Sequence, residues 1–322
     1  MQRYIIRRLL LAIPVIWMVV TLVFFVSHVR PSRAEQLAAS CQLSKEICAR
    51  NKHAIQVQLG EDKPLVVQYV RYVGHLLVGD LGKSLTAPYN PVRTELGNRA
   101  GPSIELGLIQ IILATIIAIP IGVLAAVRQD SWVDYVLRIF SIGLLAIPSF
   151  FLAPLMLLFT IKTFNWTPSL NQTAYRSLFD DPLRNLSIML LPALAGAFAS
   201  SAAIMRLLRS QMLEVTRQDF VRTATAKGLR QSVVVMRHTL KNAMIPVITI
   251  IGLLTAGLIG GNVVLESIFN IPGIGLYLVT ELRLNDLPVV LGAVISVAVV
   301  IVLTNILVDV AYAWFDPRIR YS

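Results

Sequence analysis

Six long apolar runs constrain this sequence more than any other feature. They cover residues 9–27, 106–127, 139–161, 186–205, 243–265 and 288–308. About 20 apolar residues in helical form cross the hydrocarbon core of a bilayer, and a helix satisfies its own backbone polar groups there. Charged residues make up 15% of the chain, against about 25% in a soluble domain. The sequence therefore predicts an all-α integral membrane protein with six transmembrane helices.

The first run follows three arginines, as the apolar segment of a secretory signal peptide would. It has 19 residues, whereas that segment usually has about 7 to 15 residues and is followed by an A-x-A cleavage site. No such site follows here. We therefore expect a retained first helix.

The Lys and Arg residues indicate how the chain is oriented. With the N-terminus in the cytoplasm, fifteen of the 29 fall in cytoplasmic segments and four in the short outer loops. Such an excess on the inner side is typical of membrane proteins. The other ten lie in residues 30–99, an outer segment that is too long to obey this rule strictly. We expect both termini in the cytoplasm. The net charge of +11 then belongs to membrane topology and not to nucleic-acid binding, because no aromatic residues interleave with the basic ones.

The runs divide the chain into three parts. Residues 1–29 form the N-terminal tail and first helix, residues 30–101 a small extracytoplasmic cap, and residues 102–322 a core with the other five helices. Cys41 and Cys48 lie in the cap, on the oxidising side of the membrane, where a local disulfide and two free thiols both remain open.

Helix packing and substrate contact have separate signals within the runs. Gly257 and Gly261 form a G-x-x-x-G pair, which lets helices approach closely and favours packing within the subunit. A few polar groups in the runs are candidates for contact with a passing substrate, and the sequence does not choose among them. They are Gln110, Thr115, Thr249, Thr255, Asn262 and Ser296.

Several other activities find no support. We see no nucleophile with a base and an orienting group, so no catalytic residue is assigned. The four histidines have no metal-ligand spacing. The GDLGKS segment, residues 79–84, lacks the first glycine of a phosphate-binding loop because Leu77 stands there. A stand-alone secondary transporter is the rival from another class, but the central turns of the runs contain no ionisable residue.

The cytoplasmic loop, residues 206–241, is the most informative segment. Asp219 and Arg222 can pair three residues apart on a helix surface. Small residues at 223–226 predict a short helix of low profile, which Gly228 can end in a left-handed conformation. Such a helix suits a groove in another protein. A basic surface resting on anionic lipid headgroups is the alternative.

This loop resembles the EAA loop of binding-protein-dependent ABC importers, in the dipeptide and oligopeptide branch. The RTA-x-AKGL pattern falls on Arg222, Thr223, Ala224, Ala226, Lys227, Gly228 and Leu229, and RH-x-L-x-NA-x-x-P on residues 237–246. GDLG at 79–82, PGIG at 272–275 and DPRIR at 316–320 extend the likeness over nearly the whole chain. The PGDP-like turn of the family is absent after the first run, where residues 30–33 read RPSR.

The resemblance implies a type I ABC importer permease fold and a role in peptide import. Nickel chelates, opines and glycosides are the alternative substrates of this branch. It implies a second homologous permease subunit, two cytoplasmic ATPase subunits that hold ATP and magnesium, and an extracytoplasmic solute-binding protein, with no cofactor in this chain. The expected location is a bacterial or archaeal cytoplasmic membrane. The expected ATPase-coupling residues are Asp219, Arg222, Thr223, Ala224, Ala226, Lys227 and Gly228.

Overall fold

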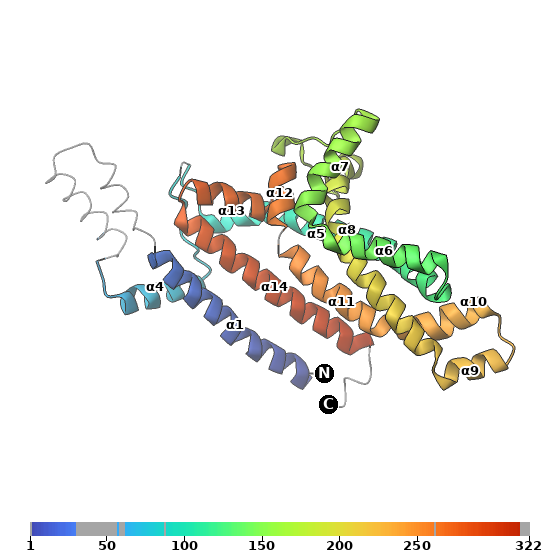
Figure 1. Cartoon of the computed structure of the whole chain (residues 1–322). Helices are drawn as coiled ribbons and strands as arrows, with labels where there is room; N and C mark the ends of the chain where they lie inside the picture. Colours follow the sequence, from blue (N-terminus) through green and yellow to red (C-terminus); the bar gives the residue numbers. More distant parts are fainter. Residues whose placement is uncertain (1, 30–56, 58–61, 87, 261, 316–322) are drawn as a thin grey trace. The chain divides into compact units, whose positions relative to one another are not determined.

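The computed structural model describes residues 2–29, 57, 62–86, 88–260 and 262–315, and helices account for nearly all of its regular structure (Figure 1). The predictions on Cys41, Cys48 and Gly261, and the fold of most of the cap, concern residues outside this part of the chain. The one bridge between described residues joins Lys83 to Pro91.

The described elements follow one another in a simple order. They are α1 (Gln2–Val29), α4 (Leu65–Leu77), α5 (Val92–Val127), α6 (Trp132–Ala146), α7 (Ser149–Phe164), η1 (Gln172–Ala174), α8 (Pro182–Thr216), α9 (Asp219–Ala226), α10 (Gln231–Val233), η2 (Val234–Leu240), α11 (Lys241–Ile259), α12 (Val263–Phe269), α13 (Ile274–Arg283) and α14 (Leu287–Phe315). Of these, η1 is a 3-10 helix and η2 is a π-helix.

The chain divides into two compact units. Unit 1 comprises Met1–Leu9, Arg99–Val279 and Val300–Ser322, and unit 2 comprises Leu10–Asn98 and Thr280–Val299. Unit 1 contains the cytoplasmic loop and most of the long helices, so it holds the candidate site.

Every predicted apolar run lies in helix, but two runs are not straight. Among the described residues, five helices are long and apolar enough to span a membrane, and two bent pairs raise the number to at most seven. The third run covers α6 and α7, which meet at 106°. Ile147 has extended dihedral angles at this bend because Pro148 follows it. The fifth run is interrupted between Ile259 and Val263. The all-helical membrane fold is confirmed, and the number of six spans stays a prediction.

Helix α5 begins earlier than its apolar run. It starts at Val92, inside the range predicted for the cap. Its first turns carry arginine, glutamate and asparagine side chains, so hydropathy alone gives no sign of a helix there. Residues 92–101 of the predicted cap are therefore helical.

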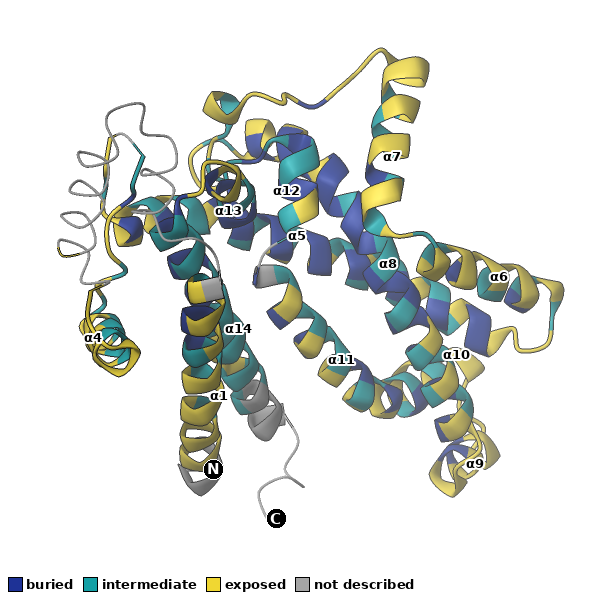
Figure 2. Cartoon of the chain, turned by 60° about the vertical axis from the view of Figure 1, so that its left-hand side comes forward, coloured by how far each residue is buried: buried dark blue, intermediate teal, exposed yellow. Residues whose placement is uncertain are grey.

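Helix α8 forms the centre of unit 1, where it packs against α6, α7 and α11. Its most apolar window is 72% buried, whereas those of α11 and α14 are 22% buried. Figure 2 shows the contrast between buried α8 and the exposed flanks of α6 and α7. Small side chains allow this burial. Gly196 lies so close to the amide of Gln110 that a Cβ atom would overlap it, and Gln110 accepts a 2.6 Å hydrogen bond from Asn262.

The described residues show no close packing at Gly257, and the predicted pair with Gly261 stays a prediction. Gly257 is exposed, and a Cβ built on it meets no described atom within 4 Å. A close approach occurs instead at Gly260, where a Cβ would overlap the side chain of Ile301. The small residues thus indicated a close approach near the end of α11, and the structure places it at Gly260 and not at Gly257.

The GDLGKS segment is a turn in unit 2. Gly79 and Gly82 have φ angles of 76° and 81°. The backbone N–H of Gly82 lowers the pKa of Asp80 below its usual range, with a smaller contribution from His75. The Asp286 carboxylate accepts hydrogen bonds from the Ser84 hydroxyl and the Leu85 N–H, each at 2.6 Å. The Gly82 carbonyl accepts a 3.0 Å bond from the Val92 N–H, so the segment also anchors the start of α5. Its likeness to a phosphate-binding loop is confined to the sequence.

Candidate coupling site

The centre of the predicted cytoplasmic loop, residues 206–241, folds into a short helix that stands between two breaks. Helix α8 ends at Thr216, and Gln218 takes an extended ψ of 150° before α9 begins at Asp219. The carboxylate of Asp219 lies in the first turn, where the helix dipole favours negative charge. At the other end Gly228 has a φ of 75°, and its N–H donates to the Thr225 carbonyl at 3.0 Å. The predicted short helix and its glycine end are both observed.

Only one side of α9 is buried. Val221 is 3% exposed and Ala224 is 5% exposed, and both belong to the core that includes Val234 of η2. The hydroxyls of Thr223 and Thr225 donate to carbonyls four residues earlier, at 2.9 and 3.1 Å. These side chains are therefore small, and their polar groups already have hydrogen-bond partners.

Six of the seven predicted coupling residues are exposed and one is not. Ala224 faces the core, whereas Asp219, Arg222, Thr223, Ala226, Lys227 and Gly228 are exposed. The predicted pair is present, with Arg222 Nη1 lying 3.6 Å from Asp219 Oδ1 on the open surface. The site therefore offers a shallow outer side of small, charged and backbone groups.

A pocket that is open to solvent lies between α9 and η2. Its volume is about 440 Å³. Its lining includes Thr216, Val221, Arg222, Thr225, Ala226, Gln231, Val234, Val235 and Thr239. Only Val221 and Ala224 of α9 are buried, so few buried atoms attach this helix to η2.

Two exposed apolar residues lie at the site outside the predicted coupling set: Phe220, which sequence reasoning missed, and Leu229, which was named only as part of the motif. Phe220 is 40% exposed and Leu229 is 41% exposed, although both are large and apolar. Burial at Val221 and Ala224 defines the inner side of α9, which leaves Phe220 off that side. The signal was an aromatic residue next to a buried i, i+3 pair on a short polar helix. Such a residue on a surface is a frequent anchor for a partner protein.

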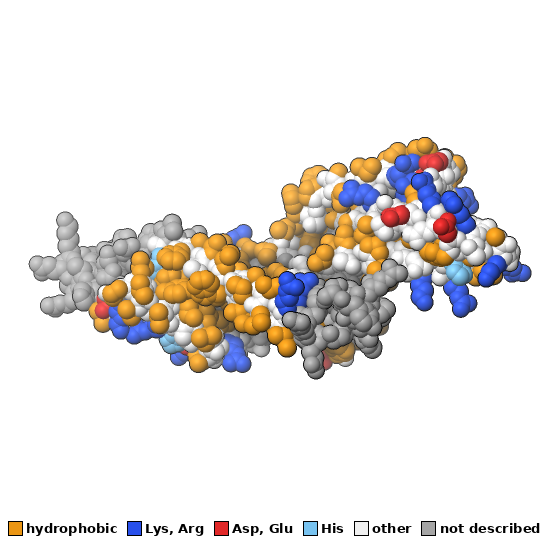
Figure 3. Space-filling view, turned by 90° about the horizontal axis from the view of Figure 1, so that it is seen from below, with side chains coloured by type: hydrophobic (Ala, Val, Ile, Leu, Met, Phe, Trp, Pro, Cys, Tyr) orange, Lys and Arg blue, Asp and Glu red, His pale blue; other side chains and the backbone are white. Residues whose placement is uncertain are grey.

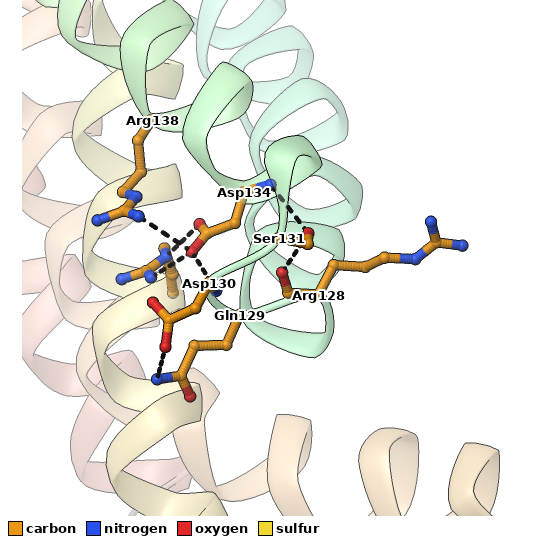
Figure 4. Close-up of polar contacts among 7 residues, drawn as sticks. Arg128, Gln129, Asp130, Ser131, Asp134 and Arg138 are labelled. Carbon is orange, nitrogen blue, oxygen red and sulfur yellow. Dashed lines mark hydrogen bonds and ion pairs between the residues drawn. The ribbon is translucent and has the colours of Figure 1, made fainter.

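A buried ion pair fixes the part of α8 that leads into α9. The Asp134 side chain is fully buried and accepts hydrogen bonds from Nε and Nη2 of Arg209, each at 2.7 Å. The backbone N–H of Asp130 adds a third bond at 3.0 Å (Figure 4). Ser131 begins α6 by accepting a bond from the Asp134 N–H. No local pattern indicates this pair, because its members are 75 residues apart.

A second buried carboxylate organises the PGIG motif. Glu266 of α12 accepts a 2.8 Å bond from the Ser103 hydroxyl and a 3.0 Å bond from the Leu276 N–H. The same Ser103 oxygen accepts the N–H of Ile274 at 2.9 Å. A Cβ on Gly275 would lie 2.6 Å from the Cα of Val263. The motif's second glycine is therefore required by close packing between α12 and α13.

A third carboxylate holds the loop between α7 and α8. Glu105 accepts hydrogen bonds from the Tyr175 and Ser177 hydroxyls at 2.8 Å and from the Asn185 amide at 2.7 Å. Burial and the bond to Glu105 raise the pKa of Tyr175 well above its usual range. These contacts make Glu105 a structural residue of the loop.

Comparison with known proteins places these features in one family. The model of the binding-protein-dependent transport system inner membrane component family matches residues 118–321, and a model of the N-terminal part of such components matches residues 1–92. A putative peptide permease protein of Brucella suis is 36% identical over the full length of both chains. A dipeptide transport system permease protein of Alkalihalophilus pseudofirmus is 35% identical, and a glutathione transport system permease protein of Salmonella paratyphi A 34%, again over both full lengths.

Among solved structures, a chain of the MetNI methionine ABC transporter in an inward facing conformation is similar in fold. Its TM-score is 0.52 at 15% identity, covering 69% of this chain and 94% of that one.

Proposed function

Because the chain belongs to the binding-protein-dependent transport system inner membrane component family, we propose that it is the membrane-spanning subunit of an ATP-driven peptide importer. The relatives named for peptide, dipeptide and glutathione transport match it over their whole length. That coverage supports peptides as the substrate class. The chain is a permease component, and we assign ATP hydrolysis, with its ATP and magnesium, to separate subunits.

The observation that carries the proposal is the exposed short helix α9. Its outer side combines a charged pair, small side chains and the exposed ring of Phe220. A groove on a cytoplasmic ATPase subunit would receive it, with Phe220 as the apolar contact and Arg222 and Lys227 as rim charges. The buried residues Val221 and Ala224 keep the helix in place on η2.

Movement of α9 can reach the membrane along two continuous paths. On one side α8, the most buried of the long helices of unit 1, leads directly into the loop. On the other side α10, η2 and α11 form a single helical run from Gln231 to Leu258. We assign η2 the role of the link, because a π-helical turn is a frequent feature of functional sites. Closure of the ATPases would then shift both helices together.

The remaining partners follow from the same family membership. We assign a second homologous permease subunit and an extracytoplasmic solute-binding protein to the complex. The chain would sit in the cytoplasmic membrane of a bacterium or archaeon with both termini in the cytoplasm, as the Lys and Arg distribution supports.

The test compares two substitutions at Gly228. A Cβ there meets no described atom within 4 Å, so only the positive φ opposes a side chain. Asparagine tolerates that conformation and valine does not. In the reconstituted complex we expect Gly228→Val to lower peptide uptake per ATP hydrolysed by about tenfold, the equivalent of 1 to 2 kcal/mol of backbone strain. Gly228→Asn should stay close to the wild type. Tightly coupled uptake by the valine variant would refute the assigned role.

Co-purification separates this proposal from a stand-alone transporter. We expect ATPase subunits to co-purify with the full-length chain after mild solubilisation, and the chain alone to move no peptide into liposomes. Uptake by the isolated chain without ATP would show a secondary transporter instead.

A further inference from the structure

A pocket on unit 1 is lined by three arginines and is separate from α9. It has a volume of about 280 Å³ and lies between α5, α6 and α8. Arg138 of α6 and Arg206 and Arg209 of α8 line it, together with the hydroxyl-bearing Ser141 and Ser210. The rest of the lining is mostly apolar and includes Ile121, Leu137, Ile142 and Met205.

The chain's own carboxylates satisfy Arg209 but leave Arg138 only weakly paired. Asp134 is engaged on both oxygens by Arg209. Its contact with Arg138 is weaker, with Nη2 at 3.4 Å from Oδ2. Besides this ion pair, the Arg138 guanidinium lies 4.5 Å from the centre of the Tyr135 ring, and its buried Nε donates no hydrogen bond to the described residues. Buried donors without acceptors are rare in proteins and call for a missing partner.

Arg206 adds a further positive charge. It lies exposed at the pocket, and no carboxylate pairs with it in the described part of the chain. Asp130 is the other acidic group near Arg209, and it accepts a bond from its neighbour Gln129. Three arginines against two carboxylates leave the pocket positively charged, with donors available to an anion.

The pocket opens beside a surface suited to lipid. Helix α6 exposes Ile139 and Ile142 by 71% and 61%, and hydrophobic side chains cover much of the described surface in Figure 3. In the first turn of α6, Trp132 is 75% exposed and Tyr135 is 53% exposed. Exposed Trp and Tyr at a helix end mark the level of the lipid headgroups. The arginines therefore lie where a membrane places its phosphates.

We propose that this pocket binds the phosphate-bearing headgroup of an anionic phospholipid. Arginine is the preferred partner of phosphate because its planar donors match two phosphate oxygens at once. Basic pockets between membrane helices are suited to such headgroups. The apolar lining would receive the first part of an acyl chain, which a free phosphate ion does not have.

The bound lipid would stabilise the base of the coupling site. Arg206 and Arg209 lie on the last turns of α8, the helix that leads directly into α9. A phosphate that bridges Arg206 to Arg138 would join α8 to α6 beside the Asp134 to Arg209 pair. The lipid is thus expected to raise the melting temperature of the protein as well as to bind.

The experiment measures lipid binding to the full-length chain, purified in a zwitterionic detergent with the subunits that co-purify. Phosphatidylglycerol, phosphatidylcholine and inorganic phosphate are titrated separately, and bound lipid is counted by native mass spectrometry. We expect phosphatidylglycerol to bind in preference to phosphatidylcholine. Arg206→Gln should weaken its apparent affinity about fivefold and Arg138→Gln by a similar factor, since each removes one cation near the phosphate.

Arg128→Gln is the matched control. Arg128 lies in the loop before α6, and its side chain points away from Asp134 (Figure 4). It is absent from the pocket lining and loses the same charge. Its lipid affinity should equal that of the wild type. An equal loss in Arg128→Gln, or none in Arg206→Gln, would overturn the site.

Two further outcomes decide the ligand. Competition by inorganic phosphate at the concentration of the lipid would assign the pocket to a free anion and overturn the lipid proposal. Equal binding of phosphatidylcholine would do the same, because that headgroup has no net charge. Arg206 is exposed, so Arg206→Gln keeps the test valid even if Arg138→Gln fails to fold.

Discussion

The coupling segment, Gln218–Gly228, and the PGIG turn, Pro272–Gly275, are both motif-bearing breaks between helices of unit 1, but they are held very differently. The PGIG turn is fastened by the Glu266 carboxylate and the Ser103 hydroxyl, and its glycine fits against backbone. The coupling segment rests on two small buried side chains beside an open pocket. One motif is explained by contacts within the chain, and the other is not.

This difference separates motifs that serve packing within the chain from motifs that serve a partner. A glycine whose missing Cβ leaves room for a neighbour is required for packing, and its motif needs no partner. Gly228 has no neighbour within 4 Å among the described residues, so the low profile of its surroundings is of use only to something outside the chain. The predictions below test this contrast.

The largest effect is expected at Gly275. In Gly275→Ala the new Cβ would meet the Cα of Val263 at 2.6 Å, and backbone cannot move aside cheaply. We expect a loss of about 3 kcal/mol of stability, measured as a lower melting temperature of the purified chain. Gly143→Ala is the control, since Gly143 is helical and its added Cβ meets no described atom. An equal effect of both substitutions would remove the packing explanation.

A smaller effect is expected at Ser103. In Ser103→Ala the Glu266 carboxylate loses a donor and the Ile274 N–H loses its acceptor. Leaving buried groups unpaired should cost about 1 to 3 kcal/mol. Ser187→Ala is the control, because Ser187 is exposed and donates only to the Arg184 carbonyl of its own helix. A melting temperature unchanged by Ser103→Ala would show that the turn does not depend on this bond.

Val221→Ala tests the attachment of α9. The side chain already borders the open pocket, so its truncation should cost only about 1 kcal/mol. Uptake per ATP hydrolysed should fall measurably despite this small loss of stability, because α9 loses two of the methyl groups that hold it against η2. Val233→Ala, at an exposed valine of α10, should change neither. Full coupling in Val221→Ala would argue against α9 as the moving part.

The smallest effect on stability is expected for Asp219→Asn. The pair with Arg222 is long and exposed, and such pairs contribute little to folding. The melting temperature should not change, whereas ATPase binding should weaken if the charge lies at the interface. A lower melting temperature with normal ATPase binding would mean that the pair is structural.

Local features could be predicted from the sequence and distant ones could not. The short helix, its end at Gly228 and the Asp219 to Arg222 pair depend on residues a few positions apart, where helix geometry is known. Glu266 with Ser103 joins residues 163 positions apart, and no periodicity encodes that contact.

The same reasoning explains the errors in the fold. An apolar run predicts burial in lipid but not straightness, so the 106° bend at Pro148 stayed hidden. The early start of α5 was missed because its first turns are polar. At Gly257 the spacing was right for close packing, but spacing does not specify which side of a helix meets a neighbour.

Hydrogen exchange can test directly whether α9 is buried against the ATPase subunits. Backbone exchange of the full-length chain would be followed alone and in complex with its ATPase subunits. We expect exchange at Asp219–Ala226 to be slower in the complex by at least about tenfold, because an interface would bury these amides. Exchange at Val263–Phe269 should not change. Unchanged exchange at α9 in a complex whose assembly is verified by mass would contradict it.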